Sequence, residues 1–125
     1  MNNELLFQAV LDEDHAPVVL CDLQHTILYM NKAAMAQNGN LVGHSLMDCH
    51  SERARALIEQ VLARFRQCPD HSRVYEFRND AQNKDVYMIA LRDPEGNLIG
   101  YYEKHEYRTR ETAALYQFAD ETKPF

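Results

Sequence analysis

Residues 73–107 read RVYEFRNDAQNKDVYMIALRDPEGNLIGYYEKHEY, and they predict the larger part of a β-sheet. Three runs in this stretch are rich in β-branched and aromatic residues, which predicts strands over 73–78, 85–92 and 98–107. The links between the runs are short and polar, and the second link, DPEGN, has a proline and a glycine that suit a tight turn. Consecutive strands joined in this way favour an antiparallel meander.

Two further strands are expected upstream of the meander. Residues 18–21 form a short apolar run, residues 22–25 are typical of a turn, and residues 26–30 are β-branched and aromatic. Between these strands and the meander, residues 52–67 repeat apolar side chains at steps of three and four behind Ser51, an expected N-cap, and so predict the longest helix. Five antiparallel strands with the middle helices over one face make an α+β fold.

Flanking helices complete the predicted architecture. Residues 4–13 favour a helix and gather four apolar side chains on one side of it: Leu5, Leu6, Ala9 and Val10. Residues from 109 to about 120 also permit a helix with an apolar face. We therefore divide the chain into an N-terminal amphipathic helix at 1–13, a main domain at 14–108, and a C-terminal helix and tail at 109–125.

Composition limits the class of protein. A chain of 125 residues has the length of one domain, and a net charge of −6 disfavours nucleic acid and anionic membrane surfaces as partners. No apolar run approaches the ~20 residues of a membrane helix and no signal peptide pattern opens the chain, so we expect a soluble cytoplasmic protein. Cys21, Cys49 and Cys68 are widely spaced without a C-x-x-C pair, which predicts reduced thiols rather than disulfides or structural zinc.

The order of these segments resembles that of PAS sensory domains. The likeness is carried by PVVLCD at 17–22, ILYMNKAA at 27–34, LVGHS at 41–45 and LRDPEGNLIG at 91–100, and it spans residues 14–108. The resemblance implies a PAS-like five-stranded sheet whose concave face and covering helices enclose a cavity for a small molecule or cofactor. It also implies that the flanking helices carry dimer contacts and signal output. Because no kinase, cyclase or DNA-binding segment follows the last expected helix, we expect the output in a separate signalling protein.

The segment MDCHS at 47–51 resembles a subset of bacterial PAS modules that carry a Cys-His pair before the long helix. The field of a helix N-terminus favours the thiolate of Cys49 and disfavours a protonated His50. Three interpretations stay open: a structural pair with an apolar Cys49, haem or metal ligation through His50, and contact with an organic ligand. The long helix lacks histidine, which weakens haem, and DCHSER at 48–53 shares too little with flavin light sensors to predict flavin, so the cofactor is left unassigned.

Side chains from the long helix and the strands are expected to line the cavity beside the Cys-His pair. Regular alternation along the first strand of the meander places Tyr75 and Phe77 on one face and Glu76 on the other. The charged residues of the strands, Glu76 and Glu103 among them, either form ion pairs with basic residues in the pocket or lie on solvated faces. The predicted ligand-binding residues are Met47, Cys49, His50, Ile58, Leu62, Phe65, Tyr75, Phe77, Met88 and Tyr101.

The resemblance implies a stand-alone sensory module that binds a small molecule and transmits its state through homodimer or partner contacts. An enzyme is not expected, because the sequence has no Ser-His-Asp order, no glycine-rich phosphate loop, and no oriented base or oxyanion device for the thiol of Cys49. The alternative is a ligand-free homodimerisation domain. Its contacts would be Leu5, Leu6, Ala9 and Val10, which are too few to form a core alone.

Overall fold

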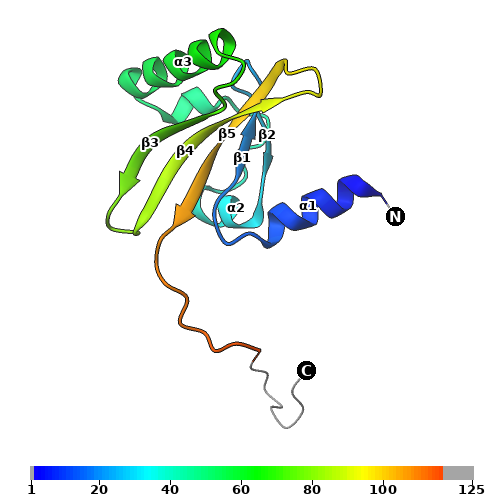
Figure 1. Ribbon diagram of the computed structural model, residues 1–125, viewed down its shortest axis with the longest axis vertical. Coiled ribbons are helices and arrows are strands. Elements are labelled where there is room, and N and C mark those ends of the chain that lie inside the picture. The colour runs from blue at the N-terminus through cyan, green and yellow to red at the C-terminus, as the bar shows by residue number, and fades with distance from the viewer. Residues whose placement is uncertain (1, 117–125) are drawn as a thin grey trace.

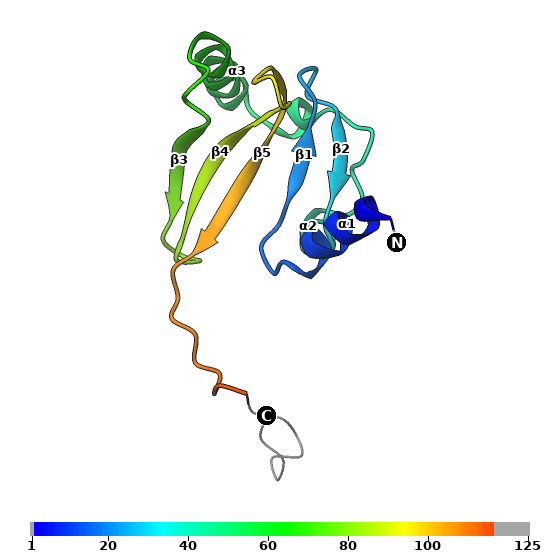
Figure 2. The same ribbon diagram turned by 45° about the vertical axis from the view of Figure 1, so that its right-hand side comes forward.

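A five-stranded sheet runs through the computed structural model, which describes residues 2–116 (Figure 1). Its strands are β1 (Val19–Cys21), β2 (Ile27–Met30), β3 (Arg73–Asn79), β4 (Lys84–Arg92) and β5 (Leu98–Tyr107). The order across the sheet is β2-β1-β5-β4-β3, and every neighbouring pair is antiparallel. The predicted α+β fold is confirmed, with the first hairpin placed beside β5 (Figure 2).

The seam between β1 and β5 joins the two halves of the sheet. Leu20 pairs with Tyr102, and Cys21 pairs with Tyr101. A Cβ atom at Gly100 would lie 2.5 Å from the carbonyl oxygen of Cys21. Glycine is therefore needed where the two backbones approach each other.

Two helices cover one face of the sheet, α2 (Lys32–Asn38) and α3 (Glu52–Gln67), and the 3₁₀ helix η1 (Leu46–Cys49) lies between them in the chain. As predicted, α3 begins behind Ser51, whose Oγ accepts a hydrogen bond from the Ala54 N–H. Buried side chains of α2 and α3 join buried side chains of the strands in one core: Cys21, Ile27, Met30, Ala34, Ile58, Leu62, Phe65, Met88, Ala90 and Tyr101. This core fixes the helix-covered face.

The C-terminal end of α3 is tied to the sheet by Arg92 on β4. Its guanidinium donates to the carbonyl oxygens of Phe65, at 2.9 Å, and His71, at 3.3 Å, and its Nε donates to Ser72. A cation at this end satisfies carbonyl groups that the helix leaves without partners. One end of α3 is thereby held against the meander.

Strand β3 departs from regular alternation at Glu76. Tyr75 pairs with Tyr87 and Phe77 pairs with Val86, so Glu76 is the extra residue of a β-bulge. The predicted shared face of Tyr75 and Phe77 is therefore wrong. Tyr75 lies on the outer face, with its ring centroid 5.3 Å from that of Tyr87, whereas Phe77 lies on the helix-covered face.

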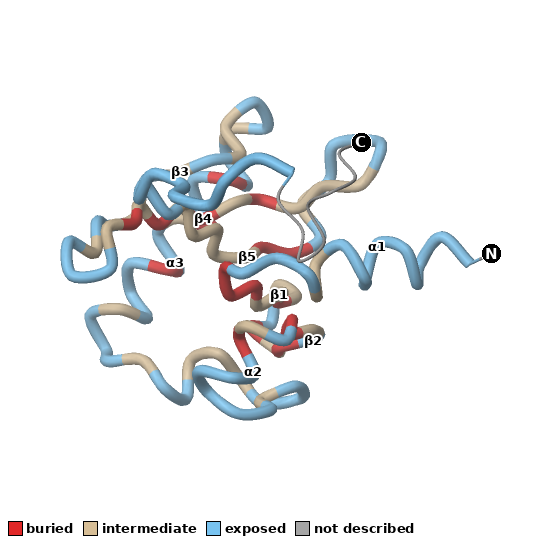
Figure 3. Tube along the Cα trace, turned by 90° about the horizontal axis from the view of Figure 1, so that it is seen from below, coloured by how far each residue is buried: buried red, intermediate tan, exposed pale blue. Residues whose placement is uncertain are grey.

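The two ends of the chain differ from each other. Helix α1 (Asn3–Glu13) forms as predicted, has no buried residue and extends away from the sheet (Figure 3). The predicted C-terminal helix is absent from residues 109–116, and the rest of that prediction lies outside the described residues. Leu115 is 88% exposed, so the segment lacks the apolar contact that a short helix needs for stability.

Candidate functional site

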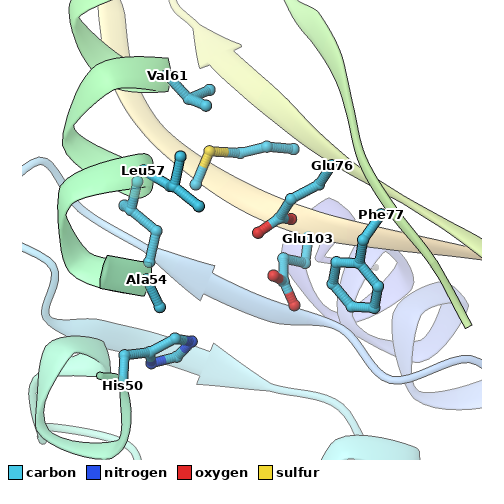
Figure 4. Close-up of a pocket in the computed structure, with 9 residues that line it drawn as sticks. His50, Ala54, Leu57, Val61, Glu76, Phe77 and Glu103 are labelled. Atoms are coloured by element: carbon cyan, nitrogen blue, oxygen red, sulfur yellow. The ribbon is translucent and has the colours of Figure 1, made fainter. Parts of the chain in front are cut away.

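A cavity of about 360 Å³ lies between α3 and the sheet (Figure 4). Its apolar walls come from Ala54, Leu57, Ile58, Val61, Phe77 and Met88, and its polar side chains are His50, Glu76 and Glu103. The helix supplies one wall because its side chains at steps of three and four face the sheet. The cavity is therefore a largely apolar space with a few polar groups, as small-molecule sites usually are.

A second cavity of about 490 Å³ adjoins the first on the side of β1, β2 and α2. Its lining includes Cys49 and Tyr101, and it shares His50 and Glu103 with the first cavity. The complete lining is Pro17, Val19, Ile27, Met30, Gln37, Asn38, Leu41, Leu46, Cys49, His50, Tyr101, Glu103 and His105. His50 and Glu103 thus stand where the two spaces meet.

Glu76 lies on the helix-covered face, as Val74 does, and its carboxyl group lines the first cavity beside Phe77. Figure 4 shows the side chains of Glu76 and Glu103 beside each other on the strand side of this cavity. Burial, and then the negative charge of Glu103, raise the pKa of Glu76 to about 8. The Oε2 atom of Glu76 is buried and has no hydrogen-bond partner among residues 2–116.

His50 presents one ring nitrogen to the cavities and uses the other for a local bond. Its Nδ1 lies 2.8 Å from the carbonyl oxygen of Leu46, which only accepts, so Nδ1 carries a hydrogen and Nε2 of the neutral ring is an acceptor. The Sγ atom of Cys49 donates to the same carbonyl at 3.3 Å and is 3.6 Å from Nδ1. Because Nδ1 is protonated, it is not a base for the thiol of Cys49. His50 caps η1, and Ser51 caps α3.

Two further polar side chains lie on the same face beside the second cavity. Nδ1 of His105 is buried without a hydrogen-bond partner in the described part of the chain, and Nε2 is 3.8 Å from Glu103. Burial, together with the charge of Lys84, lowers the pKa of His105 and favours its neutral form. Lys84 is 5% exposed, and its Nζ lies 5.4 Å from the ring centroid of Tyr107.

A hydrogen-bonded chain leads from the second cavity to the surface of α3. Nδ1 of His25 lies 2.6 Å from the hydroxyl of Tyr101, and Nε2 lies 2.5 Å from a carboxylate oxygen of Glu59. His25 is buried in the turn between β1 and β2, with a φ of 67°. Burial raises the pKa of Tyr101, so its hydroxyl stays protonated at neutral pH.

The structure places the predicted ligand-binding residues in three environments. His50, Ile58, Phe77 and Met88 line the first cavity, and Cys49, His50 and Tyr101 line the second. Leu62 and Phe65 are fully buried in the core, Met47 packs against that core, and Tyr75 lies on the opposite face of the sheet; none of these four lines either cavity.

Several site residues were missed by the sequence analysis. Glu76 was assigned to the face opposite Phe77, because a bulge leaves no mark in the hydrophobic pattern. His25 and His105 are not among the predicted ligand-binding residues, although both are mostly buried. Contact between His25 and Tyr101 joins residues 76 positions apart, and no local signal could have indicated it.

Comparison with known proteins identifies the fold. No family model and no curated protein matches the chain, but solved structures do. A PAS domain from Colwellia psychrerythraea has a TM-score of 0.62 and 11% identity, with 85% of this chain and 97% of that one covered. The chain has the PAS fold. The PAS domain of Bordetella pertussis BvgS gives a TM-score of 0.59 and 20% identity, with 87% and 89% covered.

A third structure carries a description of its role. The sensory box sensor histidine kinase from Vibrio cholerae matches with a TM-score of 0.56 and 12% identity, over 83% of this chain and 87% of that one. At these identities the likeness establishes the PAS fold, which confirms the predicted resemblance at that level. None of the helices within residues 2–116 has the length and apolarity needed to span a bilayer, and no three His, Cys, Asp or Glu side chains in this range are grouped to hold a metal ion.

Proposed function

We propose that this protein is a sensory module that binds a small organic molecule between α3 and the sheet. The observation that carries the proposal is the first cavity, which combines apolar walls with two carboxyl groups on a PAS fold. The cavity lies beside the core and shares Ile58 and Met88 with it, whereas Leu62 and Phe65 belong to the core alone. The likeness to a sensor histidine kinase supports a role in signalling.

Ligand binding would act through the elements that form the cavity walls. These walls come from His50, which follows η1, and from α3, β3, β4 and β5, so a bound molecule contacts both the helix layer and the sheet. The chain from Glu59 through His25 to Tyr101 connects the same two layers. A ligand that binds one arrangement of these layers more tightly shifts the population toward it, by no more than the difference in affinity.

Output is proposed to pass through α1 to a second copy of this chain or to a separate signalling protein. Leu5, Leu6 and Val10 are 62%, 47% and 70% exposed, and no residue of α1 is buried. An apolar stripe of this kind is stabilised by contact with another surface. The same stripe favours the second candidate, a homodimerisation domain that needs no ligand.

Native mass spectrometry of protein purified without added ligand tests the proposal. We expect a bound molecule that is released on denaturation, leaving the 14.6 kDa chain. Ala54→Phe fills the cavity and should abolish the adduct, whereas Ala56→Phe, at an exposed position of α3, should retain it. An absorption spectrum of the same sample tests for haem at His50.

Two results would count against the proposed function. An adduct that survives unchanged in Ala54→Phe lies elsewhere and contradicts the proposed site. A protein that has no adduct, and that no compound of a metabolite library stabilises against heat, favours the homodimerisation domain instead.

A further inference from the structure

The polar side chains of the first cavity favour one class of ligand. Its polar side chains are Glu76, Glu103 and His50, and its other lining side chains are apolar. Ionised carboxylates only accept hydrogen bonds, and the Nε2 atom of neutral His50 also accepts, because Nδ1 donates to Leu46. The lining therefore offers a bound molecule acceptors and negative charge.

We infer that this cavity binds an apolar organic cation whose ammonium or amidinium group lies between the carboxylates of Glu76 and Glu103. The hydrocarbon part of the molecule lies against the apolar wall formed by Leu57, Val61 and Met88. The inference rests on the proposed function and names the class of ligand.

Neither carboxyl group has a strong cationic partner in the protein. Within residues 2–116, no Lys or Arg forms an ion pair with Glu76 or Glu103, and the one basic group near Glu103 is the ring of His105, at 3.8 Å. Lys84 lies over the ring of Tyr107 instead. When Glu76 is ionised, its buried Oε2 atom has no donor among residues 2–116, and the N–H groups of a cationic ligand would satisfy it.

The surroundings strengthen attraction for a cation. The apolar walls lower the local dielectric constant, so a charge-assisted hydrogen bond is stronger there than at an open surface. The ring of Phe77 lines the same cavity and offers its face to a positive group.

The protonation state of Glu76 also supports a cationic ligand. Burial and the charge of Glu103 raise the pKa of Glu76 to about 8, so a proton neutralises the pair when no ligand is bound. A bound cation takes over this role, and the proton leaves to solvent. The other titratable groups on this face include His50, Cys49, Tyr101, His105 and Lys84, of which His105 is held neutral by burial.

The test uses three compounds that share one phenylethyl body and differ in the terminal group. These are 2-phenylethylamine, 2-phenylethanol and 3-phenylpropanoate, titrated into the full chain by isothermal calorimetry near neutral pH. We expect the amine to bind about tenfold or more tightly than either of the others. The binding enthalpy of the amine should depend on the buffer, because the proton on Glu76 is released when the amine binds.

Isosteric variants locate the preference. Glu76→Gln and Glu103→Gln should each weaken binding of the amine about tenfold and leave the alcohol unchanged. Glu95→Gln makes the same substitution in the exposed turn before β5 and should have no effect. Ala54→Phe should block all three compounds.

The outcomes separate this inference from the proposed function. If the alcohol or the carboxylate binds as tightly as the amine and Ala54→Phe blocks it, the sensory proposal stands and the cation inference is wrong. A preference for the amine that persists in both Glu→Gln variants also overturns the inference. If none of the three compounds binds, the inference is wrong, and the proposed function then depends on the mass spectrum of the purified protein.

Discussion

Nδ1 of His25 lies 2.6 Å from the hydroxyl of Tyr101, so a turn residue at one edge of the sheet is bonded to a strand at its centre. The other nitrogen of His25 reaches Glu59 on α3. One buried ring therefore connects three elements that are far apart in the sequence.

Removal of the Tyr101 hydroxyl should destabilise the protein. In Tyr101→Phe the buried Nδ1 of His25 loses its partner, and we expect the free energy of unfolding to fall by about 1–3 kcal/mol. Urea denaturation measures the change. Tyr102→Phe is the control, because the Tyr102 hydroxyl has no hydrogen bond within the described residues. Its free energy of unfolding should fall less than that of Tyr101→Phe, and equal losses would contradict the prediction.

The raised pKa of Glu76 predicts a pH dependence. Its pKa is about 8 in the folded protein against an ordinary value of 4.5, so the folded state holds this proton more tightly than the unfolded state. The contribution of Glu76 to the free energy of unfolding should therefore be fully present below pH 4.5 and decline as the pH rises through 8. We expect a loss of ~2 kcal/mol over this interval, less than the full shift implies, because solvent reaches part of the side chain.

Urea denaturation at a series of pH values measures this loss. Glu76→Gln cannot titrate and should remove most of the slope, whereas Glu95→Gln should keep it. A slope that is the same in Glu76→Gln as in the unmodified protein would assign the effect to another group.

Asn31 should be among the most sensitive polar residues. It is 0% exposed, its Oδ1 accepts from the N–H groups of Val18 and Ala34, and its Nδ2 donates to the carbonyl oxygens of Leu11 and Ala16. Asn31→Ala leaves these groups without partners, and we expect a loss of about 3 kcal/mol or more in unfolding free energy.

The control for Asn31 is a second asparagine that makes a similar bond at the surface. Asn40 accepts from the Val42 N–H and is exposed, so Asn40→Ala should cost less than about 1 kcal/mol. Equal losses in the two variants would mean that burial does not set the cost.

Helix α1 gives a prediction about assembly. If its apolar stripe joins two copies of this chain, Val10→Glu should reduce the mass measured by light scattering from twice 14.6 kDa to 14.6 kDa. Gln8→Glu adds the same charge at a polar position of the helix and should leave the dimer intact. A dimer that persists in Val10→Glu would remove α1 from the interface.

Sequence patterns predicted the parts of the fold that depend on local physical rules. Helix α3 was recognised because its cap and its apolar steps agree, and the strands of the meander because turn residues separate them. The C-terminal segment was wrongly assigned to a helix over residues 109–116, because helix propensity without apolar contact is too weak to fold a short segment.

The candidate site was predicted less completely than the fold. Periodicity indicated that Ile58 and Met88 face each other from helix and strand, and both line the first cavity. It could not indicate the bulge, which places Tyr75 and Phe77 on opposite faces of the sheet, nor the proximity of the Glu76 and Glu103 side chains. These depend on contacts between strands that only the folded chain brings together.

The bulge in β3 has a consequence for how the acidic group of this cavity can be gained or lost. Every other residue of the strand keeps a partner on β4, from Arg73 with Ile89 to Asn79 with Lys84, and Glu76 alone has none. Deletion of the single codon for Glu76 would therefore restore an uninterrupted ladder and leave Phe77 opposite Val86. Relatives of this protein could exchange a cavity with two carboxyl groups for one that has a single carboxyl group, by a one-residue insertion or deletion and without rebuilding the sheet.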